Sequence, residues 1–180
     1  MKYKGFILVA SLVVLSACRT TVKTVENDLD ELVAEDFGYV LIGLDTNKDL
    51  FRITLNGPSD YSLSSANLDH STNYILTKVK AGSYEVSRLY TTKHTSFSFD
   101  DELNFKFSVK PNTISYVGHF EIVTRGYFGF ASFLQLDNRS SEAYVYMSEN
   151  FPNILEKRAI RYGGPGEDDF LEYVISEVAP

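Results

Sequence analysis

Few residues in this chain have side chains that could carry out chemistry, and their spacing matches no known catalytic motif. The histidines are His70, His94 and His119, which lie far apart in the sequence. No Gly-x-Ser-x-Gly, His-Glu-x-x-His or Cys-x-x-Cys motif occurs. We expect His70 and His94 in loops and His119 on a strand, as surface or packed side chains. The sequence therefore assigns no catalytic residue and no cofactor.

Two acidic runs, residues 100–102 and residues 167–169, could bind a cation or supply paired carboxylates. Both occur where solvated loop charges are common, and we expect that ordinary role. An enzyme is the least favoured hypothesis. It would require a cleft that brings together two or more of a small set of side chains. These are His94, His119, Asp100, Asp101 and Glu121.

The segment Asp45-Thr46-Asn47-Lys48-Asp49 resembles the start of a calcium-binding loop. An EF-hand loop needs glycine at its sixth position and glutamate at its twelfth. The corresponding residues are Leu50 and Asn56. We therefore predict a plain turn here and no metal site.

The only cysteine, Cys18, follows a pattern typical of export signals. Lys2 and Lys4 precede an apolar run that ends at Leu15-Ser16-Ala17-Cys18. The run is shorter than the ~20 apolar residues that span a bilayer. Leu-Ser-Ala-Cys resembles the lipobox of bacterial lipoproteins. This resemblance implies cleavage before Cys18 and attachment of lipid to it, whereas the alternative is an ordinary signal peptide with a chance cysteine.

This resemblance also implies an address in the bacterial cell envelope. Residue 19 is arginine rather than aspartate, which by enterobacterial sorting rules suggests the outer membrane, facing the periplasm. Acyl chains such as palmitate would anchor the chain in the bilayer. We expect residues 1–17 to be a signal peptide, residues 18–36 to be the lipidated cysteine with a flexible tether, and residues 37–180 to be one domain.

Charge excludes one class of partner. The chain has 17 basic and 24 acidic residues, and loss of Lys2 and Lys4 with the leader leaves 15 basic residues and a formal charge of −9. Nucleic-acid binding needs a basic surface, so no nucleic-acid partner is expected. A domain of ~150 residues can bury a stable core without disulfides.

Alternating apolar residues predict that the domain is built from strands. Leu103, Phe105, Phe107 and Val109 alternate with polar residues. After Pro111-Asn112, alternation restarts at Ile114, Tyr116, Phe120 and Ile122. This pattern predicts a β-hairpin at the centre of an antiparallel sheet, with His119 on the face opposite Tyr116.

Similar patterns predict further strands. Residues 37–44 and 50–55 are expected to form a hairpin, and residues 73–80 are expected to turn at Ala81-Gly82 and return as residues 84–90. Residues 57–72 are read as a loop. Residues 127–136 and 142–148 are expected to be strands. The count of about seven to eight short strands predicts a mainly β fold, an antiparallel sandwich or a barrel.

One stretch of this pattern carries a family resemblance. Val-Lys-Ala-Gly-Ser-Tyr-Glu-Val, from residue 79, is followed by Phe-Lys-Phe-Ser-Val-Lys-Pro-Asn-Thr-Ile-Ser-Tyr-Val-Gly, from residue 105. These two sequence segments resemble those of DUF2846-like lipoproteins and related transthyretin-like or carboxypeptidase-regulatory-like domains. The resemblance implies an antiparallel β-sandwich and carries no catalytic residue. Within it, we expect Gly82 to take a positive φ and the Tyr84 ring to be buried with its hydroxyl bonded.

The C-terminal part changes character. Ser148 could cap a helix whose apolar residues continue to Tyr162, and the glycines at 163–166 would end it. This glycine run lacks the features of a phosphate loop. A last helix is expected to begin near Asp168 and Asp169, with a terminal strand as the alternative.

Together these patterns favour a non-enzymatic envelope lipoprotein that binds or scaffolds another component, an envelope protein being one possible partner. The alternative is a carrier of small molecules or lipids. The 12 tyrosines and 13 phenylalanines could line a cavity between two sheets, although an aromatic core explains them more simply.

Overall fold

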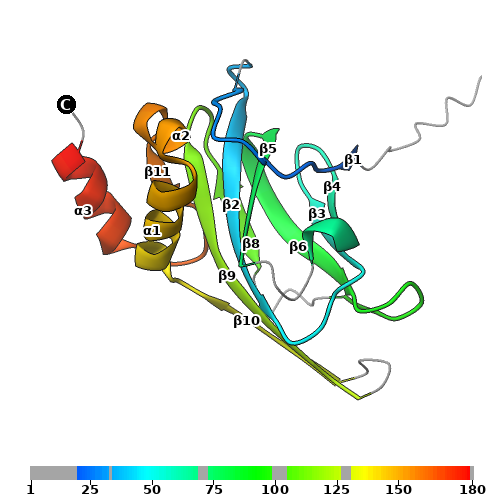
Figure 1. Cartoon of the computed structure of the whole chain (residues 1–180). Coiled ribbons are helices and arrows are strands. Elements are labelled where there is room, and N and C mark those ends of the chain that lie inside the picture. Colours follow the sequence, from blue (N-terminus) through cyan, green and yellow to red (C-terminus); the bar gives the residue numbers. More distant parts are fainter. Residues whose placement is uncertain (1–19, 33, 69–72, 99–104, 127–130, 179–180) are drawn as a thin grey trace, which may run out of the picture.

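The computed structural model describes residues 20–178, except for residues 33, 69–72, 99–104 and 127–130. Two β-sheets pack face to face, and three α-helices cover the outer face of one of them (Figure 1). The predicted mainly β sandwich with C-terminal helices is therefore confirmed.

The first sheet has the strand order β1-β4-β3-β6-β7, and β8 also pairs with β6. The β1–β4 pairing is parallel, and the other pairings are antiparallel. A short 3-10 helix, Ser65–Asn67, follows β4. The strands are β1 Thr20–Thr21, β3 Arg52–Asn56, β4 Tyr61–Ser64, β6 Gly82–Tyr90, β7 Ser96–Ser98 and β8 Lys106–Val109.

The second sheet has the order β10-β9-β2-β5, and β11 also pairs with β9. Here β9 runs parallel to β2 and to β11, so this sheet is mixed rather than purely antiparallel. The strands are β2 Phe37–Thr46, β5 Tyr74–Lys80, β9 Ile114–Arg125, β10 Ala131–Asp137 and β11 Ile160–Tyr162.

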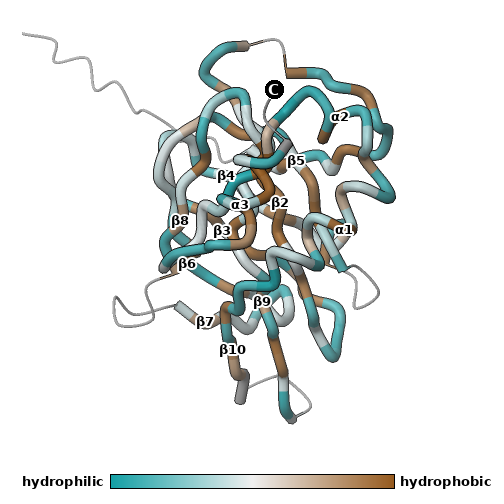
Figure 2. Tube along the Cα trace, turned by 90° about the vertical axis from the view of Figure 1, so that its left-hand side faces the viewer, coloured by the Kyte–Doolittle hydropathy of each residue, from teal (hydrophilic) through white to brown (hydrophobic). Residues whose placement is uncertain are grey.

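The helices are α1 Ser140–Asn150, α2 Pro152–Lys157 and α3 Asp169–Val178. Ala143, Met147 and Ile154 from α1 and α2 pack on Tyr39 and Tyr116 of the second sheet. This sheet is consequently buried on both faces, which explains why β2 is an almost unbroken apolar run (Figure 2).

Side chains fill the space between the two sheets. Phe105, just before β8, lies 6.1 Å from the ring of Phe120 on β9 and so joins the two sheets. Tyr84 stacks on Phe107, with ring centroids 5.6 Å apart. This packing of aromatic and aliphatic side chains gives the carrier hypothesis no support.

The three predicted hairpins are wrong, because each connects strands of different sheets. β2 and β3, β5 and β6, and β8 and β9 are consecutive strands, yet each pair is divided between the two sheets. The turn residues still have the expected geometry, with φ 142° at Gly82 and φ 57° at Asn112. The same tight, left-handed backbone can return a chain beside itself or carry it across to the facing sheet.

The predicted flexible tether is also wrong for the residues that the structure describes. Val22 is buried in the core, and the backbone N–H of Val25 donates a 2.7 Å hydrogen bond to Leu76 on β5. Farther along, Asp28 accepts hydrogen bonds from the backbone of Asn153 and Ile154 at the start of α2. Polar side chains of this segment thus satisfy backbone groups of the domain, which holds the segment in place.

The C-terminal predictions are partly confirmed. Residues 142–148, predicted as a strand, belong to helix α1, whose buried Ala143 and Met147 are four residues apart. The helix predicted to reach Tyr162 ends at Lys157 and is followed by β11. α3 begins at Asp169, as expected.

Residues 57–72, predicted as a loop, contain β4 and the 3-10 helix.

Candidate functional site

Several residues singled out from the sequence lie outside the described residues. These are Cys18, His70 and the acidic run 100–102. Among the others, His94 is exposed in the turn between β6 and β7, where its backbone N–H donates to Thr92 Oγ1 at 3.2 Å. We therefore assign His94 a place in a surface turn.

The calcium-like segment is a structural turn at the end of β2. Asn47 Oδ1 accepts a 2.8 Å hydrogen bond from Thr124 N, and Asn47 Nδ2 donates to Thr124 O at 3.0 Å. These bonds fasten the turn to β9. In the part of the chain that the structure describes, no group of three or more His, Cys, Asp and Glu side chains could hold a metal ion.

The second acidic run, residues 167–169, contains a helix cap. Asp168 is 8% exposed, and its carboxylate accepts 2.6 Å hydrogen bonds from Leu171 N and from Asn138 Nδ2. The first N–H groups of a helix lack partners within the helix, so this carboxylate stabilises the start of α3 and ties it to the segment before α1.

The predicted face of His119 is wrong, since it lies on the same side of β9 as Tyr116. Leu41 of β2 pairs with Tyr116 and Gly43 pairs with His119, so β9 has one extra residue between these pairs. Gly118, at φ 114°, lies within this bulge. A bulge shifts the alternation by one, and it turns His119 under the helical layer.

His119 lies in an aromatic setting and is only 5% exposed. Its ring meets Tyr74 edge-on, with centroids 5.5 Å apart, and Tyr74 stacks at 4.4 Å on Tyr146 of α1. Within the described residues neither His119 Nδ1 nor the Tyr74 hydroxyl has a hydrogen-bond partner. A Cβ at Gly43 would collide with His119 Nδ1, so the imidazole occupies the space that this glycine leaves.

Burial shifts the pKa values of His119 and Tyr74 so that each side chain favours its neutral form. It lowers the pKa of His119, and the Arg139 cation lowers it further. The carboxylates of Asp45, Glu142 and Asp137 raise the pKa of His119, but by less than burial and Arg139 lower it. Burial, with a smaller contribution from Glu142, raises the pKa of Tyr74 to about 12. At neutral pH the pair therefore carries no charge.

Arg139 lies at the rim of this cluster. Its Nη2 is 3.4 Å from Asp137 Oδ2 and 3.8 Å from Glu121 Oε2, and its backbone N–H donates to the Tyr116 hydroxyl at 3.2 Å. Because Arg139 immediately precedes α1, these contacts fix where the helix begins on the sheet.

This cluster has side chains that can bind a ligand, and the described contacts include no hydrogen-bonded nucleophile and base in it. Glu121 and His119 share a face of β9, but the described hydrogen bonds include none between them and none from His119 to a serine or a carboxylate. Nucleophilic catalysis needs a hydrogen-bonded nucleophile and base. The bulge at Gly118 was the feature that sequence reasoning missed, and the isolated Gly in an apolar strand was its signal.

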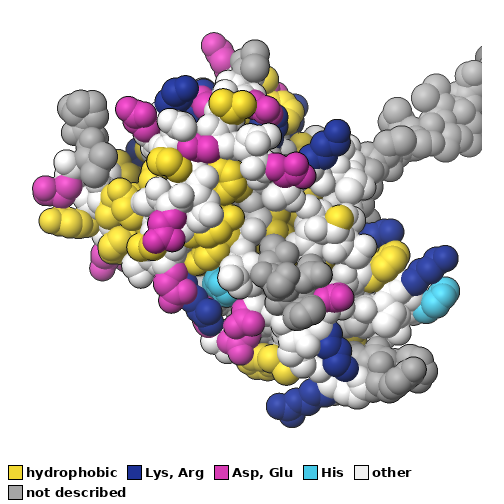
Figure 3. All heavy atoms as spheres, in the orientation of Figure 1, with side chains coloured by type: hydrophobic (Ala, Val, Ile, Leu, Met, Phe, Trp, Pro, Cys, Tyr) yellow, Lys and Arg dark blue, Asp and Glu magenta, His cyan; other side chains and the backbone are white. Residues whose placement is uncertain are grey.

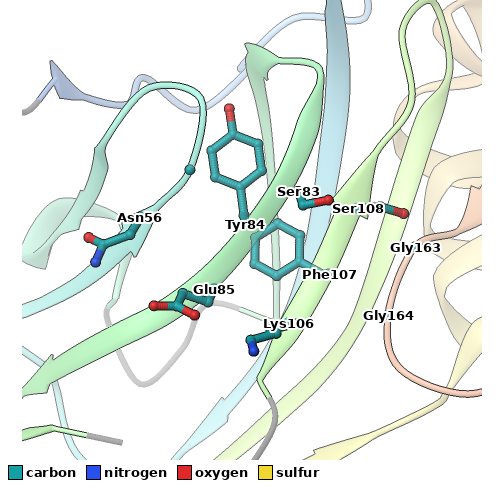
Figure 4. Close-up of a pocket in the computed structure, with 10 residues that line it drawn as sticks. Asn56, Ser83, Tyr84, Glu85, Lys106, Phe107, Ser108, Gly163 and Gly164 are labelled. Carbon is teal, nitrogen blue, oxygen red and sulfur yellow. The ribbon is translucent and has the colours of Figure 1, made fainter. Parts of the chain in front are cut away.

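A second candidate is a groove of about 570 Å³ lined by β6, β8 and the glycines at 163 and 164 (Figure 4). Ser83 and Glu85 of β6 lie beside Ser108 and Lys106 of β8, their partners in the strand register. These hydroxyl and charged groups suit a polar ligand or an extended peptide.

Gly163 closes one end of this groove. Its carbonyl accepts a 2.7 Å hydrogen bond from Ser108 N, and its N–H donates at 2.7 Å to Tyr116 O. A Cβ here would collide with the Ser108 carbonyl. The glycine run therefore links β8 to β9 by its backbone.

Among the described helices, none is long and apolar enough to cross a membrane. Comparison of this chain with known protein families, with curated proteins and with solved structures gave no match. The resemblance to DUF2846-like and transthyretin-like domains therefore stays a prediction.

Proposed function

We propose that this protein is a membrane-anchored lipoprotein of the bacterial envelope that acts as a non-enzymatic binding or scaffolding module. The observation that carries the proposal is the sequence Leu15-Ser16-Ala17-Cys18 after a charged start and an apolar run. The absence of catalytic motifs from the sequence, and the binding character of both candidate sites, support the non-enzymatic part.

The position of the first strand adds a geometric consequence. β1 begins at Thr20, where its N–H donates a 3.0 Å hydrogen bond to Asp60 O. A chain spans at most ~3.6 Å per residue, so the two-residue step from Cys18 to Thr20 can bridge no more than about 7 Å. Lipid on Cys18 would hold the β1 edge of the first sheet close to the bilayer, with no long tether between.

Metabolic labelling with radioactive palmitate tests the anchor. We expect label on the wild-type chain and none on Cys18→Ala, which removes the only thiol in the sequence. Intact mass measurement of the purified chain should show cleavage before Cys18 and added acyl groups. A labelled Cys18→Ala chain, or an unlabelled wild type, would overturn the proposal.

Separation of the inner and outer membranes tests which of the two membranes holds the protein. We propose the outer membrane because residue 19 is arginine. Arg19→Asp should move the chain to the inner membrane, while Arg19→Lys should leave it in place. Equal distribution of both variants would contradict this part of the proposal and leave lipid attachment intact.

A further inference from the structure

Large hydrophobic side chains are exposed on the helical layer. Val145 of α1 is 52% exposed, and on α3 Phe170 is 39% and Tyr173 is 64% exposed. The rings of Phe170 and Tyr144 meet edge-on at 6.3 Å, so the apolar surface passes from one helix to the other. We call these four residues the α1–α3 surface.

Packing within the domain does not account for this surface. α3 is held by Leu171, which is 1% exposed and belongs to the core under the helices. Phe170 and Tyr173 are three residues apart and lie on one side of α3, outside the buried stripe. Contiguous exposed aromatic side chains of this kind mark interaction sites on soluble domains.

Acidic residues surround the α1–α3 surface. Residues 140–178 contain eight Asp and Glu against three Lys and Arg, and neither α1 nor α3 contains a basic residue. Figure 3 shows hydrophobic and acidic side chains together over the helical layer. The exposed acids on these two helices are Glu142, Glu149, Asp169, Glu172 and Glu177.

This charge argues against two occupants. Helices that lie on anionic lipid carry Lys and Arg on their polar face, whereas α3 carries only acids. α3 and β1 also lie at opposite sides of the molecule (Figure 1). A second copy would place like charges face to face in a symmetric pair, which is unfavourable.

We infer that the α1–α3 surface is the docking site for a basic, amphipathic segment of a protein partner. Phe170, Tyr173, Tyr144 and Val145 contact the apolar face of that segment, and the surrounding acids contact its Lys and Arg side chains. This inference gives a surface to the binding module proposed above, and its test does not depend on lipid at Cys18.

The test uses the chain from Arg19 onward, which contains both cores of the domain and lacks Cys18. Two fluorescent helical peptides of about 18 residues, or five turns, serve as probes, one of Leu and Lys and the other of Leu and Glu. Anisotropy titrations measure their affinities, with each peptide in buffer alone as the background. We expect the Leu/Lys peptide to bind and the Leu/Glu peptide not to bind.

Two pairs of variants locate the binding. Phe170→Ser with Tyr173→Ser should weaken the Leu/Lys peptide by at least about tenfold. Its matched control is Phe133→Ser, since Phe133 is a 54% exposed aromatic residue on β10. Glu172→Lys with Glu177→Lys should also weaken binding of the Leu/Lys peptide, and both side chains are exposed, so the core packing stays unchanged. The matched control is Glu35→Lys, at another exposed acid, which should not weaken this binding.

The proposal is overturned if neither peptide binds, if both bind equally, or if the controls weaken binding as much as the α1–α3 variants. Dimerisation of the chain that the Phe170 and Tyr173 changes abolish would favour a second copy as occupant and overturn it. Binding of the chain to anionic vesicles through Phe170 and Tyr173 would also overturn the proposal. None of these results bears on palmitate labelling at Cys18.

Discussion

Asp30 and Arg158 form an ion pair between the N-terminal segment and the end of α2, across 128 positions of sequence. Arg158 Nε and Nη2 donate to Asp30 Oδ2 at 2.9 and 2.7 Å. Asp30 Oδ1 also accepts hydrogen bonds from the Tyr39 hydroxyl at 3.2 Å and from Leu32 N at 3.3 Å. One carboxylate therefore joins the segment, the second sheet and the helices.

Asp30→Ala should lower the free energy of unfolding by about 2 kcal/mol, the usual contribution of hydrogen bonds to a charged group. The Asp30 side chain is only 8% exposed, so its loss leaves Arg158 with unsatisfied donors. Glu31→Ala is the matched control, because the Glu31–Lys78 pair is exposed and should contribute less than about 1 kcal/mol. Urea unfolding of the chain from Arg19 onward measures both. Equal losses in the two variants would contradict this role of Asp30.

The same carboxylate should make stability depend on acid pH. Burial alone would raise the pKa of Asp30, but hydrogen bonds from Arg158 and Leu32 outweigh burial and hold this pKa below its ordinary value. The folded state therefore binds this proton less readily than the unfolded chain. Its stabilisation is present above about pH 4 and is lost as pH falls through the folded-state pKa. The difference between wild type and Asp30→Asn should shrink in that window; a difference that stays constant from pH 6 to pH 2 would contradict the assignment.

His119 should add a second pH dependence at milder acidity. Because burial and Arg139 lower the pKa of His119, the unfolded chain takes up this proton first. The free energy of unfolding should therefore fall as pH drops below about 6.5, toward the lower folded-state pKa. His119→Gln should flatten this part of the curve, while His94→Gln, at an exposed turn, should leave it unchanged. Thermal melts between pH 8 and pH 5 measure the effect, and a His119→Gln curve parallel to that of the wild type would refute it.

Tyr84 should act on stability and not on a chemical step. Its ring is 2% exposed, and its hydroxyl donates a 2.6 Å hydrogen bond to Lys80 O, as the sequence predicted. Tyr84→Ala should cost ~3–5 kcal/mol, and Tyr84→Phe only ~1 kcal/mol for the lost hydrogen bond.

Gly82→Val tests the turn beside Tyr84 through backbone strain, since Gly82 has φ 142° and a Cβ there would collide with Pro58. Thermal melts of the chain from Arg19 onward compare these variants. A melting temperature of Tyr84→Ala within a degree or two of the parent would remove Tyr84 from the core.

Local patterns in the sequence determined several elements without reference to the rest of the fold. Alternation at Phe105, Phe107 and Val109 indicated a strand with one buried face, and β8 has that face. The acids at 168 and 169 indicated a helix start, and Asp168 caps α3. Such signals depend on neighbours within a few residues, so the sequence alone contains them.

The tertiary structure alone decided which strands pair and which polar groups meet. Alternation around Gly82 is the same whether the chain forms a hairpin or crosses to the facing sheet, because both arrangements bury the same residues. Asp28 and Asp30 looked like tether residues because their partners on α2 lie more than a hundred positions away. The bulge at Gly118 placed His119 under α1, since one extra residue reverses the face of a strand. Pairing and long-range polar contacts depend on packing of the whole chain, which no local pattern records.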